Sequence, residues 1–265
     1  MRRSLVAFVL GAAAVAGGAV AAPARIDTAA TVAEPAERVA LREEPPVPVA
    51  DVRPATAYKF DCASTEATVA AAGGPRLTFG SSTIYIGTRQ ISAINQDPVM
   101  VRFDGGARTW CRDDIEATGA DGRGYGLLWD GDDALYAAFS VDGTQGTSDT
   151  QFQRFTGAGW LPGYGSGGGP KVAVLLRIAP ADGEPQLGTF LRAQLTSGRT
   201  NSFTVTDLSL VGDVIRIDGA SFFSPLDVDR SRLTCTGSSP FDVTYDMTLE
   251  LDAARSVRVA DNACV

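Results

Sequence analysis

Residues 77–112 read LTFGSSTIYIGTRQISAINQDPVMVRFDGGARTWCR, and residues 127–163 read LLWDGDDALYAAFSVDGTQGTSDTQFQRFTGAGWLPG. The two stretches align at an offset of about fifty residues. In both, a short apolar run is followed by a turn rich in Gly, Ser or Asp and then by a run that contains Tyr, which is typical of a β-hairpin. The matched positions are Phe79 with Trp129, Tyr85 with Tyr136, Arg102 and Phe103 with Arg154 and Phe155, and Trp110 with Trp160.

Weaker copies of the same unit follow along the chain. Residues 207–223, DLSLVGDVIRIDGASFF, resemble the first half of the unit, and residues 172–191, VAVLLRIAPADGEPQLGTFL, resemble the second half. A further copy is expected to begin at residues 247–260, MTLELDAARSVRVA. A period of about 40 to 50 residues with four strands per unit is typical of a propeller blade. We predict an all-β domain over residues 58–265, a small β-propeller of about four or five four-stranded blades; a β-sandwich with degenerate repeats is the alternative.

The order of these strands and turns resembles the bacterial secreted β-propeller repeat (SBBP type). The matching residues are 127–131 with 135–138, and 175–183 with 187–191. The DxxGN turn of that repeat stands here as Asp130-Gly131-Asp132-Asp133, without the asparagine. Such proteins are mostly uncharacterised exported or surface proteins. The resemblance therefore implies an architecture and a location, but no reaction.

The N-terminal region indicates export. Residues 1–21 combine two arginines, an apolar run and a small-residue cleavage motif, and are expected to be a signal peptide. Residues 22–57 are rich in Pro, Ala and Glu and are expected to be a disordered linker. No second apolar run of spanning length follows, so we expect no stable membrane insertion after cleavage. The predicted location is secreted, periplasmic or cell-surface.

The four cysteines fit an exported protein with two disulfides. Loop closure favours Cys62–Cys111 and Cys235–Cys264, with Cys62–Cys264 as an open alternative. The net charge of −8 argues against nucleic acid as a partner. The sequence contains no histidine, which removes Ser-His-Asp and Cys-His activation and histidine-ligated metals.

Three acids stand together at Asp130, Asp132 and Asp133. Asp and Gly favour tight turns, so the main interpretation is a hairpin turn. The alternative is a calcium contact, since carboxylates and turn carbonyls are the ligands that Ca²⁺ prefers. No other cofactor is indicated.

The leading functional hypothesis is a non-enzymatic surface or structural module that binds an extracellular glycan or protein. The recurring aromatic residues are expected to pack the units together. Trp160 and Tyr164 lie in a glycine-rich insertion, and we expect them to be exposed and to bind the ligand. The alternative is a carboxylate-based hydrolase acting on glycans, for which the nearest set of acids is Asp113, Asp114, Glu116 and Asp121.

Overall fold

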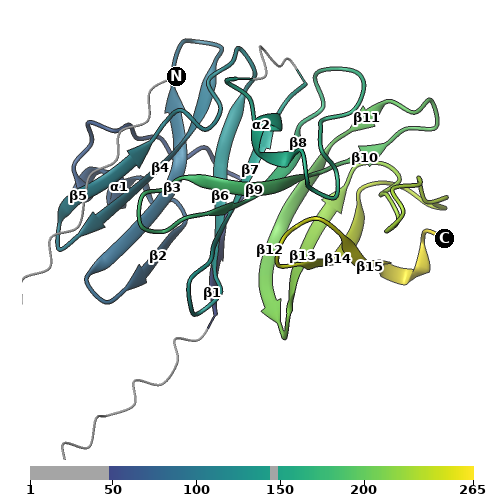
Figure 1. Ribbon diagram of the computed structural model, residues 1–265. Coiled ribbons are helices and arrows are strands. Elements are labelled where there is room, and N and C mark those ends of the chain that lie inside the picture. Colours follow the sequence, from purple (N-terminus) through teal and green to yellow (C-terminus); the bar gives the residue numbers. More distant parts are fainter. Residues whose placement is uncertain (1–47, 144–148) are drawn as a thin grey trace, which may run out of the picture. The chain divides into compact units, whose positions relative to one another are not determined.

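The computed structural model describes residues 48–143 and 149–265. The described residues form four antiparallel sheets, and the three larger ones follow one another along the chain (Figure 1). None of them is closed, and within these ranges no helix is both long and apolar enough to cross a membrane. The predicted signal peptide and residues 22–47 of the predicted linker lie outside the described residues.

The first sheet is a four-stranded meander in the order β2-β3-β4-β5. Its strands are β2 (Arg76–Phe79), β3 (Ser82–Gln90), β4 (Gln96–Asp104) and β5 (Ala107–Arg112). Helix α1 (Glu66–Ala72) precedes it, with Thr65 as N-cap and Gly73 at φ +75° after its last turn. The helix covers one face of the sheet. The shared apolar cluster contains Phe60, Val69, Tyr85, Val99, Val101 and Phe103.

The central sheet has the strand order β1-β6-β7-β8-β9. Its strands are β1 (Val49–Val52), β6 (Gly122–Trp129), β7 (Leu135–Val141), β8 (Val172–Ile178) and β9 (Pro185–Leu191). The short helix α2 (Gln153–Thr156) lies between β7 and β8. Strand β1 pairs with β6 from within the segment expected to be linker. The predicted start of the ordered domain at residue 58 is therefore too late.

The third sheet is another four-stranded meander, β12-β13-β14-β15. Its strands are β12 (Phe203–Val211), β13 (Val214–Ser221), β14 (Phe241–Thr248) and β15 (Ala254–Val259). A two-stranded ribbon of β10 (Ala193–Gln194) and β11 (Thr200–Asn201) precedes it, and the 3₁₀ helix η1 (Ala260–Asn262) follows it.

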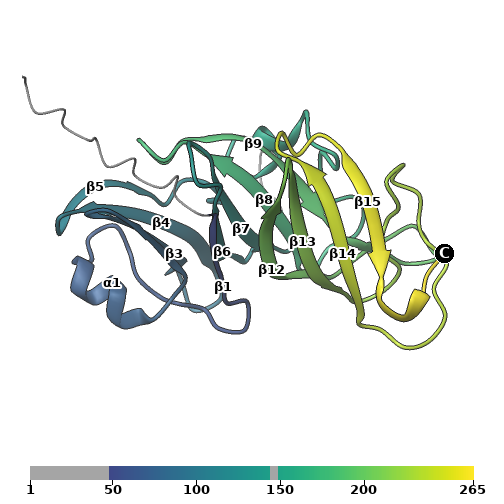
Figure 2. The same cartoon turned by 90° about the horizontal axis from the view of Figure 1, so that it is seen from below.

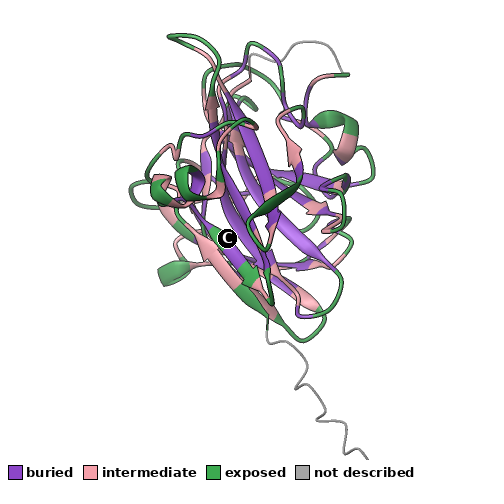
Figure 3. Cartoon of the chain, turned by 90° about the vertical axis from the view of Figure 1, so that its left-hand side faces the viewer, coloured by how far each residue is buried: buried purple, intermediate pink, exposed green. Residues whose placement is uncertain are grey.

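The central sheet is packed on both faces (Figures 1 and 2). On one face, Trp129 stacks on Phe79 of the first sheet at 5.2 Å between ring centroids. On the other, the Tyr136 hydroxyl donates to the Leu249 carbonyl, beside the third sheet, at 3.0 Å. Burial on two faces explains why β7 and β8 read as continuous apolar runs rather than alternating ones. Figure 3 shows the buried residues running along these middle strands.

The all-β prediction is confirmed. The segments expected to form the first hairpin of each repeat unit do form antiparallel strand pairs. Strands β2 and β3 are joined by Gly80-Ser81, and β12 and β13 by Gly212-Asp213. Both glycines have positive φ, 59° and 62°, which a two-residue hairpin turn requires. Residues 172–191 form β8 and β9, the second half of a meander, as expected.

The repeat alignment fails in two places. Arg154 and Phe155 lie in α2, and Trp160 follows in a loop, whereas their aligned partners lie in β4 and β5. The insertion before β8 displaces the third and fourth strands of the central sheet. Residues 247–260 contain the end of β14 and all of β15, so they complete the third meander and do not open a fourth. The described residues hold three such meanders.

Both favoured disulfides are present, Cys62–Cys111 and Cys235–Cys264. The first joins the segment before α1 to β5 of the first sheet. The second joins the long β13–β14 connection to the residues after η1. The first disulfide is thus at the first sheet and the second is beside the third sheet, so each of the two outer sheets has one cross-link.

Candidate ligand-binding site

The two aromatic residues predicted to bind a ligand are buried. Trp160 is 2% exposed and Tyr164 is 5% exposed, so the expectation of exposed rings is wrong. The Trp160 indole Nε1 donates to the Val228 carbonyl at 2.9 Å, and its ring lies 5.3 Å from that of Tyr245. The insertion folds back on the third sheet, because a large indole gains more from burial there than from solvent.

Tyr164 is held in the glycine-rich loop that follows. Its hydroxyl donates to the Pro170 carbonyl at 2.7 Å, and the Thr200 hydroxyl donates to the backbone carbonyl of Tyr164 at 2.7 Å. Burial raises the pKa of the Tyr164 phenol to about 12. Both rings thus serve packing, and Tyr164 also lines a hollow of about 370 Å³ beside Gln151 and Gln153.

The acidic run between β6 and β7 is a hairpin turn. The Asp130 Oδ1 accepts from the backbone amides of Asp132 at 2.9 Å and Ala134 at 3.0 Å, and Gly131 has φ +97°. Asp133 is exposed and stands 3.8 Å from Arg177. Within residues 48–143 and 149–265, no three Asp, Glu, Cys or His side chains are grouped as metal ligands. Calcium binding at the turn stays a prediction.

The acids considered for hydrolysis are spread along the β5–β6 connection. Asp113 pairs with Arg89, Asp114 with Arg112 at 2.8 Å, and Asp121 with Lys171 at 3.4 Å. Each of these three carboxylates thus has a cationic partner, although Arg89 also pairs with Asp97 and Arg112 also pairs with Glu184. Of the four acids, Asp113 lines a shallow hollow together with Arg89 and Gln90.

Glu116 differs from the other three because it is fully buried. Its Oε1 accepts from the Thr118 amide at 2.9 Å and from the Thr118 hydroxyl, while its Oε2 has no hydrogen-bond partner. Desolvation raises its pKa to about 7, and the charges of Asp97 and Asp142 add to the shift. A general acid needs such a pKa, but it must also touch the substrate, and this side chain is enclosed by protein.

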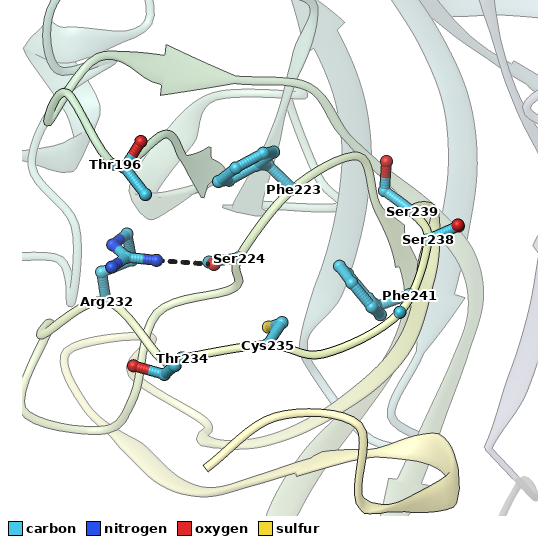
Figure 4. A pocket seen from close by; sticks show the side chains of 10 residues that line it. Thr196, Phe223, Ser224, Arg232, Thr234, Cys235, Ser238, Ser239 and Phe241 are labelled. Atoms are coloured by element: carbon cyan, nitrogen blue, oxygen red, sulfur yellow. Dashed lines mark hydrogen bonds between the residues drawn. The ribbon is translucent and has the colours of Figure 1, made fainter.

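A hollow of about 480 Å³ lies at the C-terminal end of the molecule, away from every predicted site (Figure 4). Its size falls within the range of about 300–1,000 Å³ that is usual for small-ligand sites. We call it the C-terminal hollow. It is lined by Thr196, Phe223, Ser224, Arg232, Thr234, Cys235, Gly237, Ser238, Ser239 and Phe241.

Three segments build the C-terminal hollow. Thr196 comes from the turn between β10 and β11, Phe241 begins β14, and the other residues belong to the β13–β14 connection. The connection is tied to its surroundings through the backbone. The Gln194 amide donates to the Ser224 carbonyl at 2.8 Å, and the Thr234 amide donates to the Val265 carbonyl at 2.8 Å. The Cys235–Cys264 disulfide adds a covalent link beside the hollow.

The lining combines two aromatic rings with hydroxyl groups and one cation. Figure 4 shows Phe223, Phe241 and Arg232 arranged around the space, with Thr196, Thr234, Ser238 and Ser239 near it. Arg232 Nη1 donates to the Ser224 hydroxyl at 2.9 Å. Both phenylalanines are half-buried, so their rings are anchored while part of each remains accessible.

A second, smaller hollow of about 210 Å³ adjoins the first. The two share Gly237, Ser238 and Phe241 in their linings. The adjoining hollow also carries Asp242 and Asp261 and is therefore acidic, unlike its neighbour. A ligand that extends beyond Phe241 would meet these carboxylates.

Sequence reasoning missed this site. The segment 234–241, TCTGSSPF, shows only a cysteine, small polar residues and an aromatic, which is also the composition of an ordinary loop. The partner segments lie near residues 196 and 223, so the site exists only once β14 returns beside β13. Comparison of the chain with protein-family models, with characterised proteins and with solved structures gives no match.

Proposed function

We propose that this chain is an exported, non-enzymatic recognition module that binds a glycan in the C-terminal hollow. Two observations are consistent with an extracellular setting: both disulfides are formed, and the described residues contain no membrane-spanning helix. Export itself is tested by the mass of the chain recovered outside the cytoplasm. Cleavage after Ala21 gives a chain that begins at Ala22; an intact Met1 would contradict the signal peptide.

The observation that carries the glycan proposal is the pairing of aromatic rings with hydroxyl groups in one hollow. A sugar ring has apolar C–H faces that pack on aromatic rings and hydroxyls that both donate and accept hydrogen bonds. Phe223 and Phe241 offer the first kind of contact. The second kind is offered by the hydroxyls of Thr196, Thr234, Ser238 and Ser239.

The lining supports binding rather than catalysis. The residues around the C-terminal hollow include neither of the two carboxylates that a glycosidase of the usual type requires. The hydrolase hypothesis stays a prediction.

A glycan array probed with the full exported chain tests the proposal. Binding to any saccharide should weaken at least about tenfold in Phe241→Ala, because the ring forms a wall of the hollow. Phe222→Ala is the matched control: Phe222 is 41% exposed and sits next to Phe223, but it does not line the hollow. Equal loss in both variants, or no saccharide bound at all, would contradict a glycan site here.

We also propose that the three meanders are blade-like units of the secreted-propeller type, with an open stack in place of a closed ring. Each is a four-stranded antiparallel arrangement of neighbouring segments, apart from the added strand β1. Units that contact only their neighbours open separately. Native-state hydrogen exchange should resolve at least two opening steps, one for each end sheet. A single step for all strands would favour one undivided β-sandwich.

A further inference from the structure

Arg232 is the one charged residue in the lining of the C-terminal hollow. Its Nη1 donates to the Ser224 hydroxyl at 2.9 Å and to the Leu233 carbonyl at 3.2 Å. Among the described residues it forms no ion pair, while nine other basic residues do. The nine paired residues are Arg53, Arg89, Arg102, Arg112, Lys171, Arg177, Arg216, Arg255 and Arg258.

Other described arginines, such as Arg108 and Arg123, also form no ion pair, but Arg232 is the one that lines a hollow together with two aromatic rings. The net charge is −8, and carboxylates pair with eight of the sixteen described arginines. Nearby acids stand in the adjoining hollow, at Asp242 and Asp261, rather than in the lining that contains Arg232. The positive charge therefore lies in the same lining as Phe223 and Phe241.

We propose that the C-terminal hollow is specific for an acidic saccharide, whose carboxylate or sulfate pairs with Arg232 while its ring packs on Phe223 or Phe241. This inference rests on the proposed glycan-binding function. A guanidinium presents its N–H groups in a planar fork that matches the two oxygens of a carboxylate, and such charge-assisted hydrogen bonds are stronger than neutral ones. Nη1 remains tied to Ser224, which fixes the direction of the fork.

The geometry also sets the orientation of the ligand. Arg232 and Phe241 line the same hollow, and beyond Phe241 the lining becomes acidic. Like charges repel, so the acidic group of the ligand belongs beside Arg232, and any part that reaches the adjoining hollow is neutral. An acidic peptide is the competing class of ligand. The four hydroxyl side chains near the rings favour the saccharide, because they match its many hydroxyls.

Isothermal titration of the full exported chain distinguishes these cases. The probes are tetragalacturonate, its fully methyl-esterified form, a sulfated disaccharide and a glutamate-rich peptide. The variants are Arg232→Gln, which removes the charge, Arg232→Lys, which keeps the charge but loses the fork, and Arg230→Gln as control. Arg230 is exposed two residues away and does not line the hollow. Thermal melting of each variant checks that the β13–β14 connection stays folded.

We expect an acidic saccharide to bind at least about tenfold more tightly than the ester, a preference that Arg232→Gln abolishes and Arg230→Gln leaves intact. Arg232→Lys should recover part of the affinity, and that recovery should shrink with added salt. Equal binding of acid and ester would overturn the acidic specificity and leave the glycan function standing. Binding of the peptide alone, or of no probe, would overturn both.

Discussion

The outer faces of the first and third sheets, which lie on either side of the central sheet, differ in polarity. On the first sheet, α1 and Phe60 cover the outer face with apolar contacts, and Val69 of the helix is buried against the sheet. On the third sheet, the outer face is polar and is held by Asp246, which pairs with Arg216 at 2.9 Å and with Arg258 at 3.0 Å. The outer face of the first sheet is thus covered and belongs to the core. The outer face of the third sheet is exposed to solvent, and the C-terminal hollow lies beside it.

This difference separates stability from recognition. A covered apolar face contributes to the folding free energy but offers nothing to a partner, whereas a hydrated face beside an accessible hollow can bind without unfolding anything. Each end nevertheless carries one disulfide. Substitutions at the two ends should therefore have different consequences for stability and for binding.

Removing the disulfides gives the largest expected effects. The bridged residues are 49 apart for Cys62–Cys111 and 29 apart for Cys235–Cys264. Chain-entropy arguments give a loss of about 4 kcal/mol for each double Cys→Ala variant. Urea denaturation measures the loss. Glycan binding by the folded fraction should fall only in the variant that lacks Cys235–Cys264. An equal fall in both variants would contradict the assignment of binding to the third-sheet end.

Truncating Phe60 tests whether the outer face of the first sheet is core. Phe60→Ala should lower the free energy of unfolding by about 3 kcal/mol, because it leaves a cavity under α1. Thr204→Ala on β12 is the comparison, and Thr204 pairs with Ala220 on the solvent side of the third sheet. We expect less than about 0.5 kcal/mol there. Similar costs at the two positions would mean that both faces are covered.

Glu116 makes the connection between the first and central sheets sensitive to pH. Its folded-state pKa of about 7 lies above the ordinary 4.5, so the folded chain holds a proton that the unfolded chain loses. Its contribution to stability is therefore lost as pH rises from 4.5 to 7 and is constant above that. Glu116→Gln, which stays neutral, should be more stable than the parent by roughly 2 kcal/mol at pH 8.

The same comparison at pH 4 controls this result, because both chains are neutral at the position and should unfold alike. Glu250→Gln serves as the exposed counterpart, since Glu250 pairs with Arg177 at the surface. A Glu116→Gln advantage that does not change with pH would refute the titration and leave only a packing effect.

The third sheet should respond to pH in the opposite sense. The hydrogen bond from Arg216, with further bonds from Arg258 and Ser256, holds the pKa of Asp246 below its ordinary value. Its stabilisation is present above the ordinary aspartate pKa and is lost as pH falls through the lowered one. Asp246→Asn should cost up to about 1 kcal/mol at pH 7 and nothing in strong acid. Thermal melts across pH would show a constant difference if the ion pairs were irrelevant.

The sequence predicts local structure better than it predicts the site. Hairpin turns at Gly80 and Gly212 and both disulfides follow from short-range rules, because a tight turn requires particular residues and short loops close readily. The insertion before β8 hides the repeat, since α2 occupies the place that a strand holds in the first sheet. Local pattern cannot show that an insertion folds inward.

Burial is where the sequence-based site prediction went wrong. Glycines around Tyr164 suggest an exposed loop, yet the neighbouring Trp160 finds a buried partner in Tyr245, far along the chain. Strand β1 was missed for the same reason, because its four residues are ordered by pairing with β6 and by contacts with other distant segments. The C-terminal hollow depends on three distant segments, and no short motif announces it.

Hydrogen exchange of the full exported chain, with and without saturating tetragalacturonate, tests the contrast between the ends most directly. We expect slower exchange in residues 194–199 and 222–242, around the C-terminal hollow, and unchanged exchange in α1 and the first sheet. Protection that centres on the first sheet, or no protection of residues 222–242 at saturation, would contradict the assignment of recognition to the C-terminal end.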